Sequence, residues 1–173
     1  MKRLFGVVAA GLLTLGLVGG AMAAGPTNYI SFLNGDNENP VRETDAHGVA
    51  IFQLSADGTE LRYRLIVSEI NNVVAAHIHV GTAEVNGPVT LFLFAGADPG
   101  SGPFEGSISS GTATAADLTG PLGGMPLSAL VDLMNTGGAY TNVHTNDGVA
   151  PTNTGAGDFP GGEIRGQVQV LNP

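Results

Sequence analysis

The chain has 173 residues, with 15 Asp and Glu, 6 Lys and Arg, and no Cys. Two of the basic residues lie at positions 2 and 3, so the remainder sets four Arg against fifteen acids, a formal net charge of −11. Such a surface repels phosphate backbones and anionic lipids, which argues against nucleic acid or a membrane surface as a partner. Without disulfides the fold depends on a hydrophobic core, and a chain of this size can bury one.

The first 23 residues have the layout of a cleavable signal peptide. A basic pair precedes an almost wholly apolar run at 4–18, and Ala21-Met22-Ala23 supplies the small residues that signal peptidase requires. The apolar run is short for a membrane span, and an uncleaved anchor helix is the alternative hypothesis. We therefore predict a signal peptide at 1–23 and one domain at 24–173, located in the periplasm or outside the cell.

Short strands separated by turns are predicted along the rest of the chain. Alternation is cleanest at 61–67, where Arg62 and Arg64 share one face, and Asp57-Gly58 before it is typical of a hairpin turn. Further strands are predicted at 28–33, 48–54, 73–80, 89–94, 104–114, 139–145 and 162–171. A Gly-, Asn- and Pro-rich loop is expected at 146–160.

Only two segments have helical signals. Residues 114–117 resemble a single capped turn, and 126–135 place apolar residues at helical spacing before the stop signal Gly137-Gly138. Strands therefore do not alternate with helices. The predicted fold is all-β, an antiparallel Greek-key β-sandwich or barrel with one short helix.

Three of the four histidines fall in predicted strands. His77 and His79 are at positions i and i+2, so they point to the same side, about 6.5–7 Å apart along the backbone. His144 shares a face with Tyr140 and Asn142 in the strand 139–145. The fourth, His47, lies in a polar turn and is interpreted as solvated.

The apolar neighbours of these histidines predict which face they occupy. One side of the strand 73–80 is unbroken and apolar and is expected to enter the core, and it consists of Val74, Ala76, Ile78 and Val80. His77 and His79 then face outward, and so does His144, opposite an inward Val143. Three such imidazoles suit copper, or zinc as the alternative, with one position open. The competing hypothesis is that they form cross-strand hydrogen bonds and bind no metal.

A three-histidine copper site has a predictable response to acid. Imidazoles at their ordinary pKa of ~6.5 would release the metal below about pH 6.

Other polar residues give weaker signals. Glu163 and Arg165 are expected on the outer face as a solvated ion pair that contributes little. Asp36 and Glu38 are the best-spaced carboxylates, and they lie on a loop without support. No Ser-His-Asp order, phosphate-binding loop or nucleophilic Cys is present, so no catalytic residue is assigned.

Several segments together resemble the CHRD domain, which is repeated in the developmental protein chordin and occurs singly in bacterial secreted proteins. They are AHIHVG at 76–81, NGPV at 86–89, YTNVHT at 140–145, PGGEIRGQ at 160–167, DGTELRY at 57–63 and the opening LNGDNENP at 33–40. The resemblance spans about residues 29–170, and it departs from the family at Asn39, where Val and Pro are usual. It implies an extracellular domain, and the bacterial members share no settled activity.

A second likeness is to the copper/zinc superoxide dismutase family. Its β-sandwich binds copper through an HxH strand pair and a third, later His, which His77, His79 and His144 match in type and order. The zinc-binding half and the disulfide of that family are missing, and Arg165 matches its guiding Arg only loosely in spacing. The likeness implies a superoxide-dismutase-like fold, with an Ig-like sandwich as the alternative, and a copper site.

Three functions follow as hypotheses. The first is a non-enzymatic copper-binding module for storage, delivery or protection. The second is a metal-free module that binds a protein partner, as the chordin resemblance implies. The third is a redox enzyme of the superoxide dismutase kind, which the charge of −11 disfavours because only four Arg are available to attract an anionic substrate.

Overall fold

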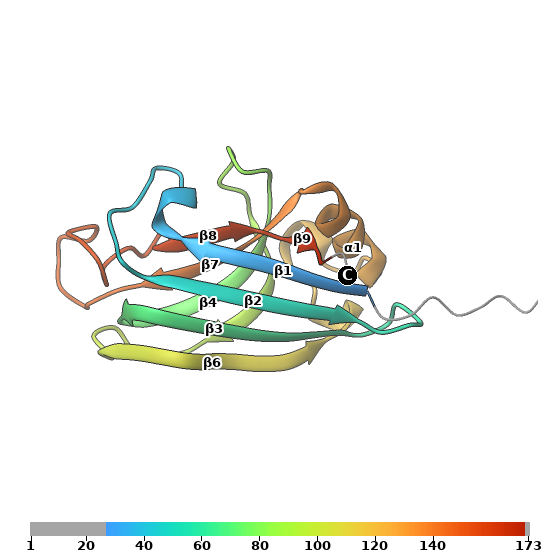
Figure 1. The fold of residues 1–173 in the computed structure, drawn as a ribbon, viewed down its shortest axis with the longest axis horizontal. Coiled ribbons are helices and arrows are strands. Elements are labelled where there is room, and N and C mark those ends of the chain that lie inside the picture. The colour runs from blue at the N-terminus through green and yellow to red at the C-terminus, as the bar shows by residue number, and fades with distance from the viewer. Residues whose placement is uncertain (1–26, 172–173) are drawn as a thin grey trace, which may run out of the picture.

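The computed structural model describes residues 27–171, which form one rolled β-sheet with a helix at one end (Figure 1). The predicted signal peptide at 1–23 lies outside these residues. The strands are β1 (Thr27–Asn34), β2 (His47–Leu54), β3 (Leu61–Asn71), β4 (Val73–Val80), β5 (Val89–Ala95), β6 (Pro103–Ala113), β7 (Ala139–Thr145), β8 (Ile164–Gln167) and β9 (Gln169–Val170). The helices are α1 (Leu127–Thr136) and the 3-10 turns η1 (Gly35–Asn37), η2 (Ala115–Asp117) and η3 (Gly120–Leu122).

All strand pairs are antiparallel, in the order β5-β4-β7-β8-β1-β2-β3-β6, with β9 beside β1. The outer strands β5 and β6 approach each other, and the Leu93 carbonyl on β5 accepts hydrogen bonds from the Ser109 hydroxyl on β6 and the Tyr63 hydroxyl on β3. The sheet is therefore a nearly closed barrel. Across this closure β6 lies beside β5, so the spatial order β7-β4-β5-β6 is that of a Greek key. The predicted all-β Greek-key architecture is confirmed.

Alternation along the strands fills the barrel. Ala50 and Phe52 on β2 and Leu65 on β3 have fully buried side chains. Arg62 and Arg64, which alternate with the inward residues of β3, are exposed. Removing this apolar surface from water is the main stabilising contribution, at about 25 cal/mol per Å². The core consequently needs no disulfide.

Helix α1 closes one end of the barrel with an apolar stripe. Leu127, Leu130 and Met134 are buried at helical spacing, as predicted. Gly137 ends the helix in the left-handed conformation, with φ of 70°, and its amide bonds to Leu133. The predicted capped turn is also present, since Thr114 and Asp117 form a capping box.

Strand β4 departs from the predicted alternation at its start. Val73 is fully buried and Val74 only half-buried, because the register with β7 shifts between Val73 and Ala75. A bulge of this kind moves one residue out of the alternating pattern, which periodicity alone does not reveal. Beyond it, Ala76 and Ile78 enter the core as predicted.

The close crossing of β8 and β1 makes Gly166 sensitive to substitution. A Cβ added there would lie 2.2 Å from the Phe32 carbonyl oxygen and 2.6 Å from Ser31 Oγ. We expect Gly166→Ala to lower the free energy of unfolding by roughly 2–3 kcal/mol, because the two strands must separate. Urea unfolding measures this.

The matched control is Gly123→Ala. Gly123 is exposed, its φ of −56° suits alanine, and the nearest atom to an added Cβ lies at 3.4 Å. Its stability should stay within about 0.5 kcal/mol of the parent. Equal stability of both variants would contradict the argument.

Candidate metal centre

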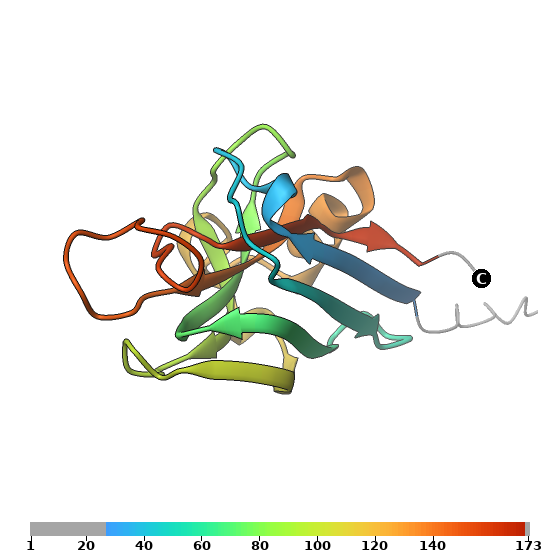
Figure 2. The same cartoon turned by 60° about the vertical axis from the view of Figure 1, so that its left-hand side comes forward.

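The structure brings the three predicted histidines together. His77 and His79 lie on β4, and His144 lies on the adjacent strand β7. All three are on the face directed away from the core, yet His77 is only 8% and His79 only 7% exposed. Loops before and after these strands cover that face, and the longest, at 146–163, projects beyond the barrel (Figure 2).

The nitrogen atoms of the three rings converge. One ligand-competent nitrogen from each ring lies within 4.8 Å of the others, and His77 Nδ1 is 3.1 Å from His144 Nε2. Two nitrogens bound to one ion at 2.0–2.1 Å are at most ~4.2 Å apart. The widest pair must therefore close slightly, which small rotations of the imidazoles provide. In residues 27–171 no other group of three His, Cys, Asp or Glu is so arranged.

Main-chain carbonyls determine the tautomers of two rings. His79 Nδ1 is 2.9 Å from the Gly87 oxygen, and His144 Nδ1 is 2.9 Å from the Pro160 oxygen. Because a carbonyl only accepts, each Nδ1 carries the hydrogen and each Nε2 presents a lone pair. The Nε2 of His79 is buried, and no atom of the described residues forms a hydrogen bond with it. Anchoring of this kind is typical of metal-binding histidines.

His77 differs from the other two because, within residues 27–171, the one hydrogen bond of its ring goes to a neighbouring imidazole. Its Nδ1 contacts the Nε2 of His144, so in the metal-free protein Nδ1–H donates to that lone pair. The half-exposed ring of Phe92 packs edge-on against His77, with centroids 4.6 Å apart. To bind an ion through Nδ1, His77 must first move its hydrogen to Nε2.

Burial keeps the three imidazoles neutral. Burial is the main cause and the neighbouring histidines contribute, so that the pKa of His77 and of His144 is lowered to about 4. The pKa of His79 is also lowered, chiefly by burial. The expected acid release below about pH 6 assumed unperturbed imidazoles; with the lowered pKa values, any metal held by these rings would be released only at more acidic pH.

A three-layer stack supports His79. The Tyr140 ring lies parallel to the imidazole at 4.9 Å between centroids, and the Arg165 guanidinium lies 3.4 Å from the centre of the Tyr140 ring. The same guanidinium donates to the carbonyl oxygens of Thr82 and Val85, at 2.7 and 3.0 Å. Arg165 thereby holds the loop whose Gly87 anchors His79.

The predicted solvated pair of Glu163 and Arg165 is wrong. Arg165 is only 1% exposed and Glu163 is fully buried, and they form no ion pair with each other. Glu163 instead accepts hydrogen bonds from the hydroxyls of Thr44 and Thr145, both at 2.6 Å, and from the Gly157 amide at 2.8 Å. Alternation placed both residues on the correct face, but it could not show that loops cover that face.

Glu38, expected on a loop without support, is a second correction, because it is buried and hydrogen-bonded to β7. It is 7% exposed and accepts a hydrogen bond of 2.7 Å from Asn142, the cross-strand neighbour of His77. Burial raises its pKa to about 7. The sequence placed Asn142 on the face of His144, but no local pattern connects a loop residue near position 38 with β7. His47 is exposed, as interpreted.

These observations define a class of domain: an all-β Greek-key barrel with a loop-covered cluster of three histidines. The chain belongs to the CHRD domain family, whose family model matches residues 29–168, so the resemblance seen in the sequence is confirmed. CHRD domains are generally extracellular or secreted modules. No curated protein matches this chain. Residues 27–171 contain no helix with the length and apolar character needed to cross a membrane.

The lowered histidine pKa values predict how stability depends on pH. Between about pH 6.5 and 4 the unfolded chain protonates His77 and His144 while the native protein does not, so their contribution to stability is lost as pH falls. Glu38 acts in the opposite sense, because its raised pKa favours the native state at low pH and loses that effect as pH rises through about 7.

A double variant, His77→Gln with His144→Gln, separates the two contributions. Urea unfolding of metal-free protein at pH 7, 6 and 5 should show a parent-minus-variant difference that falls with pH. A difference that is constant across this range would contradict the buried, neutral histidines.

The contacts of Arg165 predict that lysine cannot replace it. Arg165→Lys loses the planar fork, whose Nη2 donates to two carbonyls while Nη1 donates to Asn86, and it loses the contact with Tyr140, so stability should fall by roughly 1.5–3 kcal/mol. Arg62→Lys on the exposed face of β3 is the control and should change stability by less than about 0.5 kcal/mol. Similar thermal denaturation midpoints for both variants would refute the role of Arg165.

Proposed function

We propose that this CHRD domain is an exported, non-enzymatic metal-binding module that holds copper through His77, His79 and His144. The observation that carries the proposal is the convergence of three neutral imidazoles, two of them anchored by main-chain carbonyls so that each presents an Nε2 lone pair. Export follows from the predicted signal peptide at 1–23 and agrees with the extracellular character of the family.

A metal explains the arrangement better than cross-strand hydrogen bonding does. Hydrogen bonding accounts for His77 and His144, which contact each other, but leaves the buried Nε2 of His79 unpaired. An unsatisfied buried polar atom costs about 1–3 kcal/mol. An ion bound at this nitrogen removes that cost and uses the other two rings as well.

The donor set favours copper among the available ions. Three imidazole nitrogens suit both copper and zinc, but Cu²⁺ binds a given nitrogen site more tightly than Zn²⁺ does. Oxygen-preferring Ca²⁺ and Mg²⁺ are disfavoured, because the three converging donors are imidazole nitrogens. The net charge of −11 carried by the domain attracts cations of either kind.

Replacing one ligand tests the shared site. His79→Ala should weaken copper binding by at least about tenfold, because one of three donors is lost. Because the ring lies outside the core, the variant should remain folded. His47→Ala is the control, since His47 is exposed and bonds only to the nearby Asp45 carbonyl. Calorimetric titration with Cu²⁺, and in parallel with Zn²⁺, gives the affinities.

The outcomes separate the hypotheses. Equal copper affinity of His79→Ala and the parent defeats the three-histidine site and leaves the metal-free interaction module. If zinc binds more tightly than copper, the proposed metal is zinc and the three-histidine site is retained. Circular dichroism of each variant confirms that a lost affinity does not reflect unfolding.

A further inference from the structure

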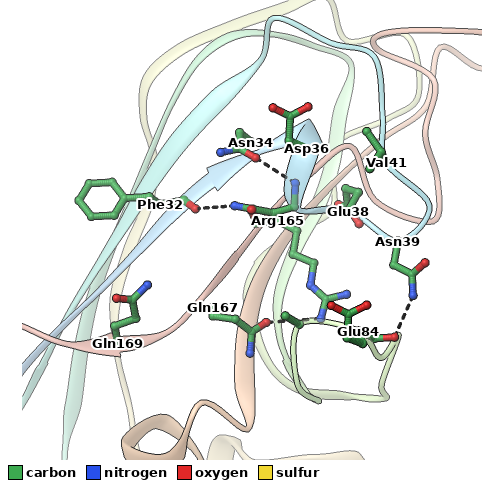
Figure 3. A pocket seen from close by; sticks show the side chains of 12 residues that line it. Phe32, Asn34, Asp36, Glu38, Asn39, Val41, Glu84, Arg165, Gln167 and Gln169 are labelled. Carbon is green, nitrogen blue, oxygen red and sulfur yellow. Dashed lines mark hydrogen bonds between the residues drawn. The ribbon is translucent and has the colours of Figure 1, made fainter.

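A hollow of about 570 Å³ lies on the outer face beside the metal centre, between the loop that follows β1 and the loop that follows β4 (Figure 3). Figure 3 shows it to be elongated, with Phe32 and Gln169 at one end and Asn39 and Glu84 at the other. Its volume is within the ~300–1,000 Å³ that ligand pockets occupy. It therefore has room for more than a single side chain.

Hydrogen bonds between the loops form the hollow without any ligand. The Asn39 side chain donates to the Glu84 carbonyl at 2.9 Å, and the Asn86 side chain donates back to the Asn39 carbonyl. The Asn37 side chain bonds to the Arg165 carbonyl on the floor at 3.0 Å. A ligand would thus meet walls that are already ordered, which reduces the entropic cost of binding.

The lining selects a cation. Asp36 and Glu84 are exposed carboxylates from opposite loops, and Glu38 lies deeper in the wall. Arg165 is the one cationic side chain in the lining, and its guanidinium is already bonded to the loop after β4 and stacked on Tyr140. An anionic ligand would find repulsion there, whereas a guanidinium or ammonium group would find carboxylates.

The spacing of the acids argues for an organic cation over a metal ion. In the described part of the chain, only the three histidines bring three ligating atoms together, so Asp36, Glu38 and Glu84 do not share one ion. The hollow also has an apolar part, because Phe32 is 61% and Val41 60% exposed. Figure 3 shows these two residues on opposite sides of Asn34 and Asp36, so apolar atoms of an extended segment can cover them while a charged end reaches the acids.

We propose that this hollow binds an arginine or lysine side chain from an extended segment of a protein partner. The basic group contacts Asp36 and Glu84, and neighbouring apolar atoms of the segment cover Phe32 and Val41. A domain with four Arg, fifteen acids and no Lys in residues 27–171 is complementary in charge to such a partner.

The test uses the ¹⁵N-labelled exported protein without metal. A capped Leu-Arg-Ala tripeptide should produce saturable NMR shifts at residues around the hollow, and the shifts should weaken with added salt. The isosteric peptide with citrulline, which lacks the charge, should not bind. Asp36→Asn combined with Glu84→Gln should weaken binding by about tenfold or more, whereas Asp132→Asn, an exposed acid on α1, should leave it unchanged.

Four results would overturn the proposal. They are equal binding of the citrulline peptide, shifts scattered over the whole acidic surface, an equal effect of Asp132→Asn, and tighter binding of agmatine, a free guanidinium compound, than of the peptide. Because the metal-free protein is used, and His79→Ala should bind the peptide normally, this proposal and the copper proposal succeed or fail separately.

Discussion

The buried guanidinium of Arg165 is the interaction on which the organised outer face depends. It is 1% exposed, yet no carboxylate in residues 27–171 forms an ion pair with it, and main-chain carbonyls and the face of Tyr140 take the place of water. A buried charge is costly unless it is fully hydrogen-bonded, so the loop after β4 has one favourable position. That position sets the Gly87 carbonyl beside His79 and shapes one wall of the hollow.

Two opposite electrostatic environments therefore lie side by side on this face. The histidine cluster is shielded and neutral, because burial lowers the pKa of its rings. The adjacent hollow is open and acidic, with Asp36 and Glu84 exposed. Glu38 lies at the boundary, bonded to Asn142, with its pKa raised to about 7. Neutral donors favour a transition metal, and the surrounding carboxylates favour the approach of any cation.

Local periodicity was sufficient for the strands and for the faces of the histidines. The i, i+2 spacing of His77 and His79 and the position of Val143 opposite His144 placed all three rings on the outer side, where they lie. Periodicity failed where distant segments meet. The burial of Arg165 and Glu38 depends on loops from other parts of the chain, and the bulge at Val73 depends on pairing with β7. Neither the burial of these two residues nor the bulge can be predicted from the residues next to them in the sequence.

The pairing of the first and last described segments has a consequence for how such domains are joined. The Leu171 amide donates to the Asn28 carbonyl at 2.8 Å, so the chain enters and leaves the barrel at the same end (Figure 1). Linkers attached there would leave the loop-covered face unobstructed. Several copies in one polypeptide, or one copy fused to a larger protein, would then each expose that face to solvent.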